Sequence, residues 1–285
     1  MTPMNFKSLD HLNQAITDNL PAIRKLGPFD YIVGIPRSGM LVANALSIFM
    51  GGIPVADIYQ FMSGQCVSHK KERRVLLTPN TRILLVDDTV SMGGAMRDAL
   101  NKLHSLSTNF KITKMAVWIA PDSPDVVDYY CGIERKPRIF EWNMWKNERL
   151  KNVAFDLDGV FCRDPDQHEN DKGPNLQRYY QNADVKFIPE VPVKYIITNR
   201  LERHRRDTEG WLSKYNITYD KLIMKENEKE GHIEHKTRKI KSVLNDISLY
   251  VESSERQASR IAEKVNIPIW CIDNRQLYNT AENIL

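Results

Sequence analysis

Residues 83–96, with the sequence ILLVDDTVSMGGAM, decide the fold of the first half of the chain. The apolar run 83–86 predicts a buried parallel strand that ends in two adjacent acids, Asp87 and Asp88. A turn of small residues and a helix with a regular apolar face follow. Backbone N–H groups of such a turn cradle a phosphate, and the acids suit sugar hydroxyls or a metal. The segment therefore predicts a phosphorylated-sugar site at a strand end in an α/β sheet.

The same segment resembles the 5-phosphoribosyl 1-diphosphate (PRPP) signature of type I phosphoribosyltransferases. The resemblance implies that Asp87 and Asp88 hold the ribose hydroxyls. It also implies a turn that grips the 5-phosphate, made of Ser91, Met92, Gly93, Gly94 and Ala95. The family usually has Thr in place of Met92, and often Thr or Ser in place of Ala95. Two hydroxyl donors, each worth roughly 1.5–3 kcal/mol, are thus missing, and we expect weaker or altered phosphate binding. The alternative is an acidic strand end without a ligand.

A second turn, residues 34–39, follows a short strand at 31–33 and precedes a helical run. This alternation predicts a parallel α/β sheet, with both turns at the carboxyl ends of strands. The turn resembles the pyrophosphate loop of the same family, which implies that Arg37, Ser38 and Gly39 bind the substrate. The guanidinium of Arg37 offers a planar fork of donors for a phosphate. Upstream, residues 8–26 predict an amphipathic helix.

Two further segments complete the resemblance. Residues 63–80 lie where the family keeps a mobile loop, and the cations there that suit leaving pyrophosphate are Lys70, Lys71, Arg73 and Arg74. Residues 138–145 resemble the aromatic hood that purine-type members place over the base. The resemblance implies that Trp142 or Trp145 stacks on a planar ring, a contact worth about 1–3 kcal/mol. The alternative is that both tryptophans pack against the domain that follows.

The chain has 285 residues, 42% of them hydrophobic and 27% charged, which allows two ordinary domains with real cores. No apolar run approaches the roughly 20 residues that span a bilayer. The N-terminus lacks the layout of a signal peptide, and the four cysteines lack metal-ligand spacing. We expect a cytoplasmic protein without a membrane partner. A net charge of +4 is too small to indicate nucleic-acid binding.

A second domain is expected to follow, which gives domains over residues 1–148 and 149–285. The apolar residues 153–155 predict a strand that leads into Asp156, Asp158 and a glycine. This pattern resembles the first motif of the haloacid dehalogenase (HAD) phosphatase superfamily. The resemblance implies that Asp156 is the nucleophile and Asp158 the acid/base.

Three more segments follow in the order that this superfamily has. They imply that Thr198 holds the transferring phosphoryl group and that Lys236 neutralises it together with the nucleophile. They also imply that Glu252 binds Mg²⁺ with Asp156 and Asp158, although the superfamily has paired aspartates where Glu252 and a serine stand here. The intervals between these segments leave no room for a large cap, so an open site is expected.

The expected fold class is α/β, with two domains that each have a mainly parallel sheet flanked by helices. The first is phosphoribosyltransferase-like and the second a HAD-like Rossmannoid fold with a minimal cap. The leading hypothesis is a bifunctional enzyme of nucleotide metabolism, a glycosyltransferase joined to a hydrolase. It moves ribose 5-phosphate from PRPP to a base, purine-like by the hood, and releases pyrophosphate. A Mg²⁺-dependent phosphatase acting through an aspartyl-phosphate then removes a phosphate, such as that of the ribosyl product.

Two alternatives stay open. In one, the first domain is a PRPP or nucleotide sensor that regulates the phosphatase, which Met92 and Ala95 motivate. In the other, the protein is a polynucleotide end-phosphatase with an open site. The leading hypothesis requires only small-molecule partners (PRPP, a base and a phosphate monoester), and the sequence leaves a homodimer open.

Overall fold

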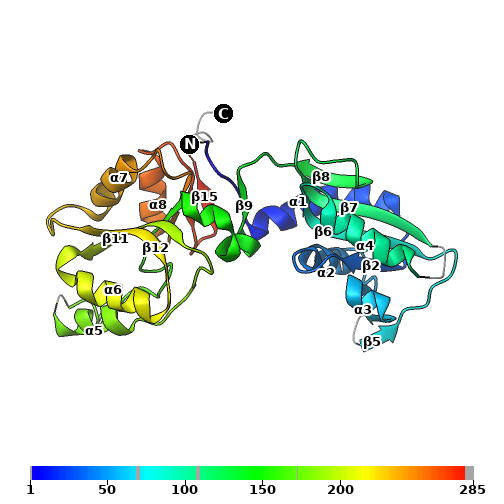
Figure 1. Ribbon diagram of the computed structural model, residues 1–285, viewed down its shortest axis with the longest axis horizontal. Coiled ribbons are helices and arrows are strands. Elements are labelled where there is room, and N and C mark those ends of the chain that lie inside the picture. The colour runs from blue at the N-terminus through cyan, green and yellow to red at the C-terminus, as the bar shows by residue number, and fades with distance from the viewer. Residues whose placement is uncertain (1, 69–70, 107–109, 172, 280–285) are drawn as a thin grey trace. The chain divides into compact units, whose positions relative to one another are not determined.

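The computed structural model describes residues 2–68, 71–106, 110–171 and 173–279. The chain divides into two compact units, and each is an α/β sheet flanked by helices (Figure 1). The N-terminal unit is Lys7–Arg138, and the C-terminal unit combines Met1–Phe6 with Ile139–Leu285. Residues 139–148, which the sequence placed in the first domain, therefore pack with the second unit.

The sheet of the N-terminal unit has the strand order β5-β4-β3-β2-β6-β7-β8. Its parallel strands are β3 (Val55–Asp57), β2 (Tyr31–Gly34), β6 (Arg82–Val90), β7 (Lys111–Ile119) and β8 (Tyr129–Ile133). An antiparallel hairpin, β4 (Gln65–Ser68) and β5 (Lys71–Arg74), extends one edge. This hairpin stands where the sequence predicted a mobile loop. Lys70 lies outside the described residues, and Arg74 is exposed.

Helices cover both faces of this sheet because its strands bury side chains on both sides. In β6, Ile83 and Leu85 join the core under α3 (Ile58–Met62) and α4 (Gly94–His104). Leu84, which lies between them, is also fully buried. On this sheet β6 contacts α2 (Gly39–Phe49), and α2 packs against α1 (Leu9–Leu26). The predicted helix at 8–26 is confirmed, and the hydroxyl of Ser8 accepts a hydrogen bond from the backbone N–H of His11 to cap it.

The sheet of the C-terminal unit has the strand order β12-β11-β10-β13-β14-β15. Its parallel strands are β12 (Tyr219–Lys225), β11 (Val193–Leu201), β10 (Val153–Phe155), β13 (Leu249–Glu252) and β14 (Ile269–Cys271). The edge strand β15 (Gln276–Tyr278) is antiparallel to β14. A separate ladder pairs β1 (Asn5–Lys7) with β9 (Arg138–Phe140).

This second sheet also has two covered faces. Phe155 of β10 lies in the core with α5 (Pro174–Asn182) and α6 (Arg205–Lys214), whereas Ala154 lies in the core with α7 (His232–Ser242) and α8 (Glu255–Ala262). The short 3₁₀ segments Glu141–Lys146, Glu148–Asn152 and Glu202–His204 connect the elements. Within the described residues, no helix combines the length and apolarity that crossing a membrane needs.

Candidate functional site

The acidic pair of the N-terminal unit lies beyond the end of the neighbouring strand. The register of β2 with β6 stops at Gly34 and Val86, and β6 continues through Asp87 and Asp88. The backbone N–H of Ile35 donates to the carbonyl of Val86 at 2.9 Å, which holds the turn 34–39 beside the acids. A Cβ on Gly39 would lie 2.7 Å from that carbonyl oxygen and 3.2 Å from Oδ1 of Asp87. The structure thus brings the two predicted segments together, and only glycine fits between them.

Asp87 and Asp88 are both buried, which makes their charges costly without a ligand. Oδ1 of Asp87 accepts a hydrogen bond from the N–H of Asp88 at 2.9 Å. Burial, with the charge of Asp88 adding to it, raises the pKa of Asp87 to about 9. Two buried carboxyl groups of this kind provide acceptors for the hydroxyls of a sugar.

The turn after the acids has the shape of an anion cradle. Gly93 precedes α4 with φ 73°, and a Cβ there would lie 2.8 Å from a methyl group of Val126. Arg97 closes the turn by donating to the carbonyl of Met92 at 2.7 Å. The Met92 side chain is 66% exposed, and Ala95 is exposed as well. Phosphate donors here are therefore the backbone N–H groups at the start of α4 and the hydroxyl of the half-buried Ser91.

Arg37 is exposed and Ser38 half-buried, directly before α2. The peptide bond between Pro36 and Arg37 is cis. These residues belong to the same turn as Gly39, so the predicted pyrophosphate segment lies at the same edge of the sheet as the acidic pair.

The two tryptophans both belong to the C-terminal unit. Trp145 stacks on Phe187 at 4.7 Å between ring centroids and packs against the core that contains Phe155. Phe187 thus covers one face of the Trp145 ring, which favours the packing alternative for this residue. Trp142 is half-buried and stacks on Phe140 at 5.1 Å.

In the C-terminal unit, one lysine joins two carboxylates. Nζ of Lys236, on α7, lies 2.6 Å from Oδ2 of Asp156 and 2.7 Å from Oε2 of Glu252. All three groups are buried, and Asp156 and Glu252 follow or end the neighbouring strands β10 and β13. Burial raises the pKa of Asp156 well above its usual range; Lys236 opposes this, and the charges of Glu252 and Asp158 add to it. One ammonium thus serves two buried carboxyl groups, and its contact with Asp156 favours the ionised form of that residue.

Glu252 and Thr198 lie beneath the surface of this site. Glu252 is 0% exposed, one oxygen accepts from Lys236, and the other accepts from the N–H groups of Ser253 and Ser254 at 3.0 and 3.2 Å. In this arrangement Glu252 orients Lys236. Thr198 is fully buried, and its hydroxyl accepts from the N–H of Arg200 at 3.1 Å.

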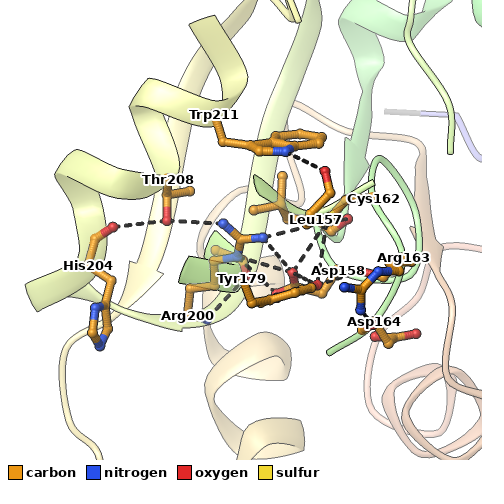
Figure 2. A network of polar contacts seen from close by, with 12 residues as sticks. Leu157, Asp158, Cys162, Arg163, Asp164, Tyr179, Arg200, His204, Thr208 and Trp211 are labelled. Atoms are coloured by element: carbon orange, nitrogen blue, oxygen red, sulfur yellow. Dashed lines mark hydrogen bonds and ion pairs between the residues drawn. The ribbon is translucent and has the colours of Figure 1, made fainter. Parts of the chain in front are cut away.

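Asp158 is held by a second network, which Figure 2 shows. The guanidinium of Arg200 donates to both of its carboxylate oxygens, at 2.7 Å for the shortest contact, and the Tyr179 hydroxyl donates at 2.8 Å. The thiol of Cys162 lies 3.4 Å from the same carboxylate. Burial alone would raise the pKa of Asp158, but Arg200 outweighs it and lowers that pKa. An ionised Asp158 accepts a proton, so the acid half of its predicted role is disfavoured in this arrangement.

Sequence reasoning missed the role of Arg200. The signal was present, since Arg200 stands two residues after Thr198 on β11, and alternate residues of a strand point to the same face. Its partner could not be found that way, because Arg200 and Asp158 are 42 residues apart in the chain.

Both networks border one cavity of about 560 Å³ at the carboxyl edge of the sheet. Asp156, Asp158, Asp164 and Lys236 line it, together with Asn199, whose amide donates to Gln257 at 3.0 Å. Burial and the charges of Asp158 and Asp273 raise the pKa of Asp164. The size is that of a small-molecule site.

The implied Mg²⁺ can be tested against these donors. Within the described residues, no group of three or more His, Cys, Asp or Glu side chains is arranged to hold a metal. Mg²⁺ in proteins keeps several waters, however, and needs only one or two carboxylates beside a substrate phosphate. Asp156 and Asp164 both line the cavity and are the carboxylates that would hold such an ion beside a substrate phosphate. Glu252 does not line the cavity.

Comparison with known proteins gave a family match that covers the N-terminal unit. Residues 7–147, just under half of the chain, match the family model of the phosphoribosyl transferase domain. No curated protein matches the chain. The match ends at residue 147, so it says nothing of the phosphatase interpretation of the C-terminal unit.

Solved structures give weaker likenesses. The purine phosphoribosyltransferase of Pyrococcus horikoshii Ot3 is 21% identical over 49% of this chain and 93% of its own, with a TM-score of 0.38. The Helicobacter pylori xanthine-guanine-hypoxanthine phosphoribosyltransferase is 15% identical over 49% of this chain and 92% of its own, with a TM-score of 0.39. A Neisseria gonorrhoeae hypothetical protein with bound ppGpp is 17% identical over 50% and 90%, with a TM-score of 0.39. TM-scores this low carry no argument beyond the family match. Residues 7–147 are thus similar in sequence to the phosphoribosyl transferase domain, and most of this match, residues 7–138, is the N-terminal unit.

Proposed function

We propose that the protein is a bifunctional enzyme of nucleotide metabolism. The N-terminal unit transfers ribose 5-phosphate from PRPP to a base, and the C-terminal unit hydrolyses a phosphate monoester. The first activity is supported by the match to the phosphoribosyl transferase domain and by the placing of Asp87 and Asp88 beside the Gly39 turn. The second is supported by Asp156, which follows the central strand, contacts Lys236 and lines a cavity.

In the transfer step, a ring nitrogen of the base attacks C1 of PRPP. A C–N bond forms, the bond from C1 to the pyrophosphate oxygen breaks, and pyrophosphate leaves with the electron pair. The proton of the attacking ring nitrogen goes to solvent. Asp87 and Asp88 accept hydrogen bonds from the ribose hydroxyls, the turn at 91–95 binds the 5-phosphate, and Arg37 binds pyrophosphate. A purine-like base suits this proposal, although the covered ring of Trp145 leaves Trp142 as the aromatic candidate.

In the hydrolytic step, a carboxylate oxygen of Asp156 attacks phosphorus and the bond from phosphorus to the ester oxygen breaks. The ester oxygen leaves with the electron pair and takes a proton from solvent to form the alcohol. An aspartyl-phosphate forms, and a water molecule then attacks it to release inorganic phosphate and restore Asp156. Lys236 stabilises the negative charge on both the carboxylate and the phosphoryl group. Asp158, kept ionised by Arg200, accepts the proton of that water.

Mg²⁺ bound by Asp156 and Asp164 would supply neutralisation of the phosphoryl charge during attack. The two activities fit in sequence, because the ribosyl product of the first carries a phosphate monoester that the second can hydrolyse. The substrates are therefore small molecules: PRPP, a base and a phosphate monoester.

The test uses the full-length protein and two assays. Pyrophosphate release from PRPP across a panel of bases measures the transferase, and p-nitrophenyl phosphate measures the phosphatase. We expect Asp156→Asn to lower hydrolysis by at least about 1000-fold, because the nucleophile is lost, and to leave pyrophosphate release unchanged. Asp87→Asn with Asp88→Asn should show the reverse pattern. The exposed Asp220→Asn is the matched control for both assays. Undiminished hydrolysis by Asp156→Asn would refute the second activity.

A sensor function is the second candidate, and the exposed Met92 favours it because no side-chain hydroxyl stands at that position of the phosphate turn. A sensor would bind PRPP in calorimetry, release no pyrophosphate with any base, and change the phosphatase rate when PRPP is added.

A further inference from the structure

Lys225 carries a buried positive charge in the wall of the cavity that Asp156 lines. It is the last residue of β12 and is 3% exposed. Its ammonium donates one hydrogen bond, to the backbone carbonyl of Glu228 at 3.3 Å. In the part of the chain that the structure describes, this ammonium has no carboxylate partner. Two of its three donors are therefore available to the cavity.

The neighbouring charged groups do not neutralise Lys225. The carboxylate of Glu228 is paired with Arg203 at 2.9 Å, so these two side chains compensate one another. His232, one turn before Lys236 on α7, also lines the cavity. Burial, together with the charges of Lys225 and Lys236, lowers the pKa of His232 and keeps its ring neutral. This wall of the cavity thus keeps one uncompensated positive charge.

Burying an ammonium without a counter-charge lowers the free energy of unfolding. The single hydrogen bond of Lys225 to a backbone carbonyl does not neutralise its charge. An anionic ligand would offset this loss of stability. The charge therefore indicates a ligand group rather than a packing role.

The position of Lys225 separates it from the reacting phosphoryl group. Asp156 follows β10, Lys225 ends β12, and β11 lies between these strands. Adjacent strands lie about 4.8 Å apart, and by the register Lys225 lies two residues beyond the level of Asp156, so the two backbone positions are roughly 12 Å apart. The side chains of both residues extend into the cavity wall between these positions. Lys236, already paired with Asp156, serves the phosphoryl group itself. Lys225 is thus placed for a second group on the same ligand, at the distance that a sugar ring bridges.

We propose that Lys225, with His232 beside it, forms a second anion subsite, and that the substrate of the C-terminal unit is a phosphate monoester carrying a second phosphate. This inference rests on the proposed phosphatase function of the same cavity. Two kinds of substrate carry a second phosphate on the same sugar as the phosphate that is hydrolysed. They are a nucleoside bisphosphate and the terminal nucleotide of a nucleic-acid chain.

The experiment compares two substrates in the full-length protein. Adenosine 3′,5′-bisphosphate is the doubly charged probe, and adenosine monophosphates are the reference. We expect wild-type kcat/KM to favour the bisphosphate by about tenfold or more, the size of one charge-assisted hydrogen bond. Lys225→Met should abolish this ratio. The control Lys221→Met, an exposed lysine on the same strand, should keep it. A short phosphorylated oligonucleotide as third substrate distinguishes the two sources of the second phosphate.

Two further measurements keep the outcome decisive. The Tm of Lys225→Met should equal or exceed the wild-type value, because an unpaired buried charge is removed; a clear fall would indicate a structural role and overturn the subsite. Calorimetric binding of the bisphosphate to Asp156→Asn, with and without Lys225→Met, tests the subsite without turnover. Loss of binding in the double variant supports it even if the phosphatase assay fails, and a ratio that survives in Lys225→Met refutes it.

Discussion

The ammonium of Lys236 lies 2.6 Å from a carboxylate oxygen of Asp156, and both residues are almost fully buried. The same ammonium also serves Glu252, so one buried positive charge stabilises two buried carboxylates. Removing it leaves both without a partner, which is far more costly than removing a surface lysine.

Lys236→Met is therefore expected to destabilise the C-terminal unit by roughly 3–5 kcal/mol and to abolish phosphate-ester hydrolysis. Urea unfolding followed by tryptophan fluorescence measures the first effect, and p-nitrophenyl phosphate the second. Lys241→Met, on the exposed side of the same helix, is the control and should change stability by less than about 0.5 kcal/mol. Equal stability of the two variants would contradict the buried cluster.

Glu252→Gln tests whether this residue holds a metal. Glu252 does not line the cavity and its carboxylate contacts Lys236 and two backbone N–H groups, so we expect Mg²⁺ affinity to stay within about threefold of wild type. Asp156→Asn and Asp164→Asn should each weaken Mg²⁺ binding by about tenfold or more, because each removes a carboxylate that lines the cavity. Calorimetric titration after treatment with a chelator gives the three affinities. A large loss in Glu252→Gln alone would restore the ligand role that its sequence position predicted.

Two glycines that each begin a helix form a matched pair in the N-terminal unit. A Cβ on Gly39 would press on the carbonyl of Val86, whereas one on Gly94 meets nothing within 4 Å. Gly39→Ala should cost roughly 1–3 kcal/mol and weaken PRPP binding, since the turn must move away from Asp87. Gly94→Ala should be neutral or stabilising by up to about 0.5 kcal/mol. Thermal unfolding measures both, and similar losses in the two variants would mean that the close contact at Gly39 has no importance.

Because the pKa of Asp87 is raised in the folded protein, we expect the free energy of unfolding to decrease as pH rises. In the unfolded chain this carboxyl group loses its proton near 3.8, and in the folded protein near 9. Between these values the unfolded state binds fewer protons, so deprotonation favours unfolding and the contribution of Asp87 is lost progressively. Asp87→Asn removes this dependence and should exceed wild-type stability at pH 8 by on the order of 1–3 kcal/mol, with little difference at pH 4.

Urea unfolding of Asp87→Asn and of the wild type between pH 4 and 9 measures how the difference in their unfolding free energies changes with pH. Asp98→Asn, on the exposed face of α4, is the control. A wild-type advantage that grows with pH would contradict the burial of an uncompensated acid.

Local pattern was sufficient to predict the strands and the residues at their ends. Asp156 was found from an apolar run that stops at an acid, and Asp87 in the same way, because chain order and side-chain alternation determine where a strand ends. The side chains that contact these residues could not be predicted from local pattern. That Glu252 holds Lys236, that Arg200 holds Asp158, and that Phe187 covers Trp145 all depend on packing between segments distant in the chain. Lys225 was missed because an uncompensated charge is recognised only after its surroundings are known.

The opening residues of the chain have a practical consequence. Met4 and Phe6 lie in the core of the C-terminal unit, where Phe6 packs on Trp270 at 4.4 Å and the N–H of Met4 donates to Ser248. The N-terminal unit, Lys7–Arg138, is thus inserted within the sequence of the C-terminal unit, and the chain passes between the two units twice. A fragment that starts at residue 139 would uncover the indole of Trp270 and tend to aggregate. A variant that joins residue 6 to residue 139 through a short Gly/Ser linker, without residues 7–138, would keep Met4 and Phe6 in this core.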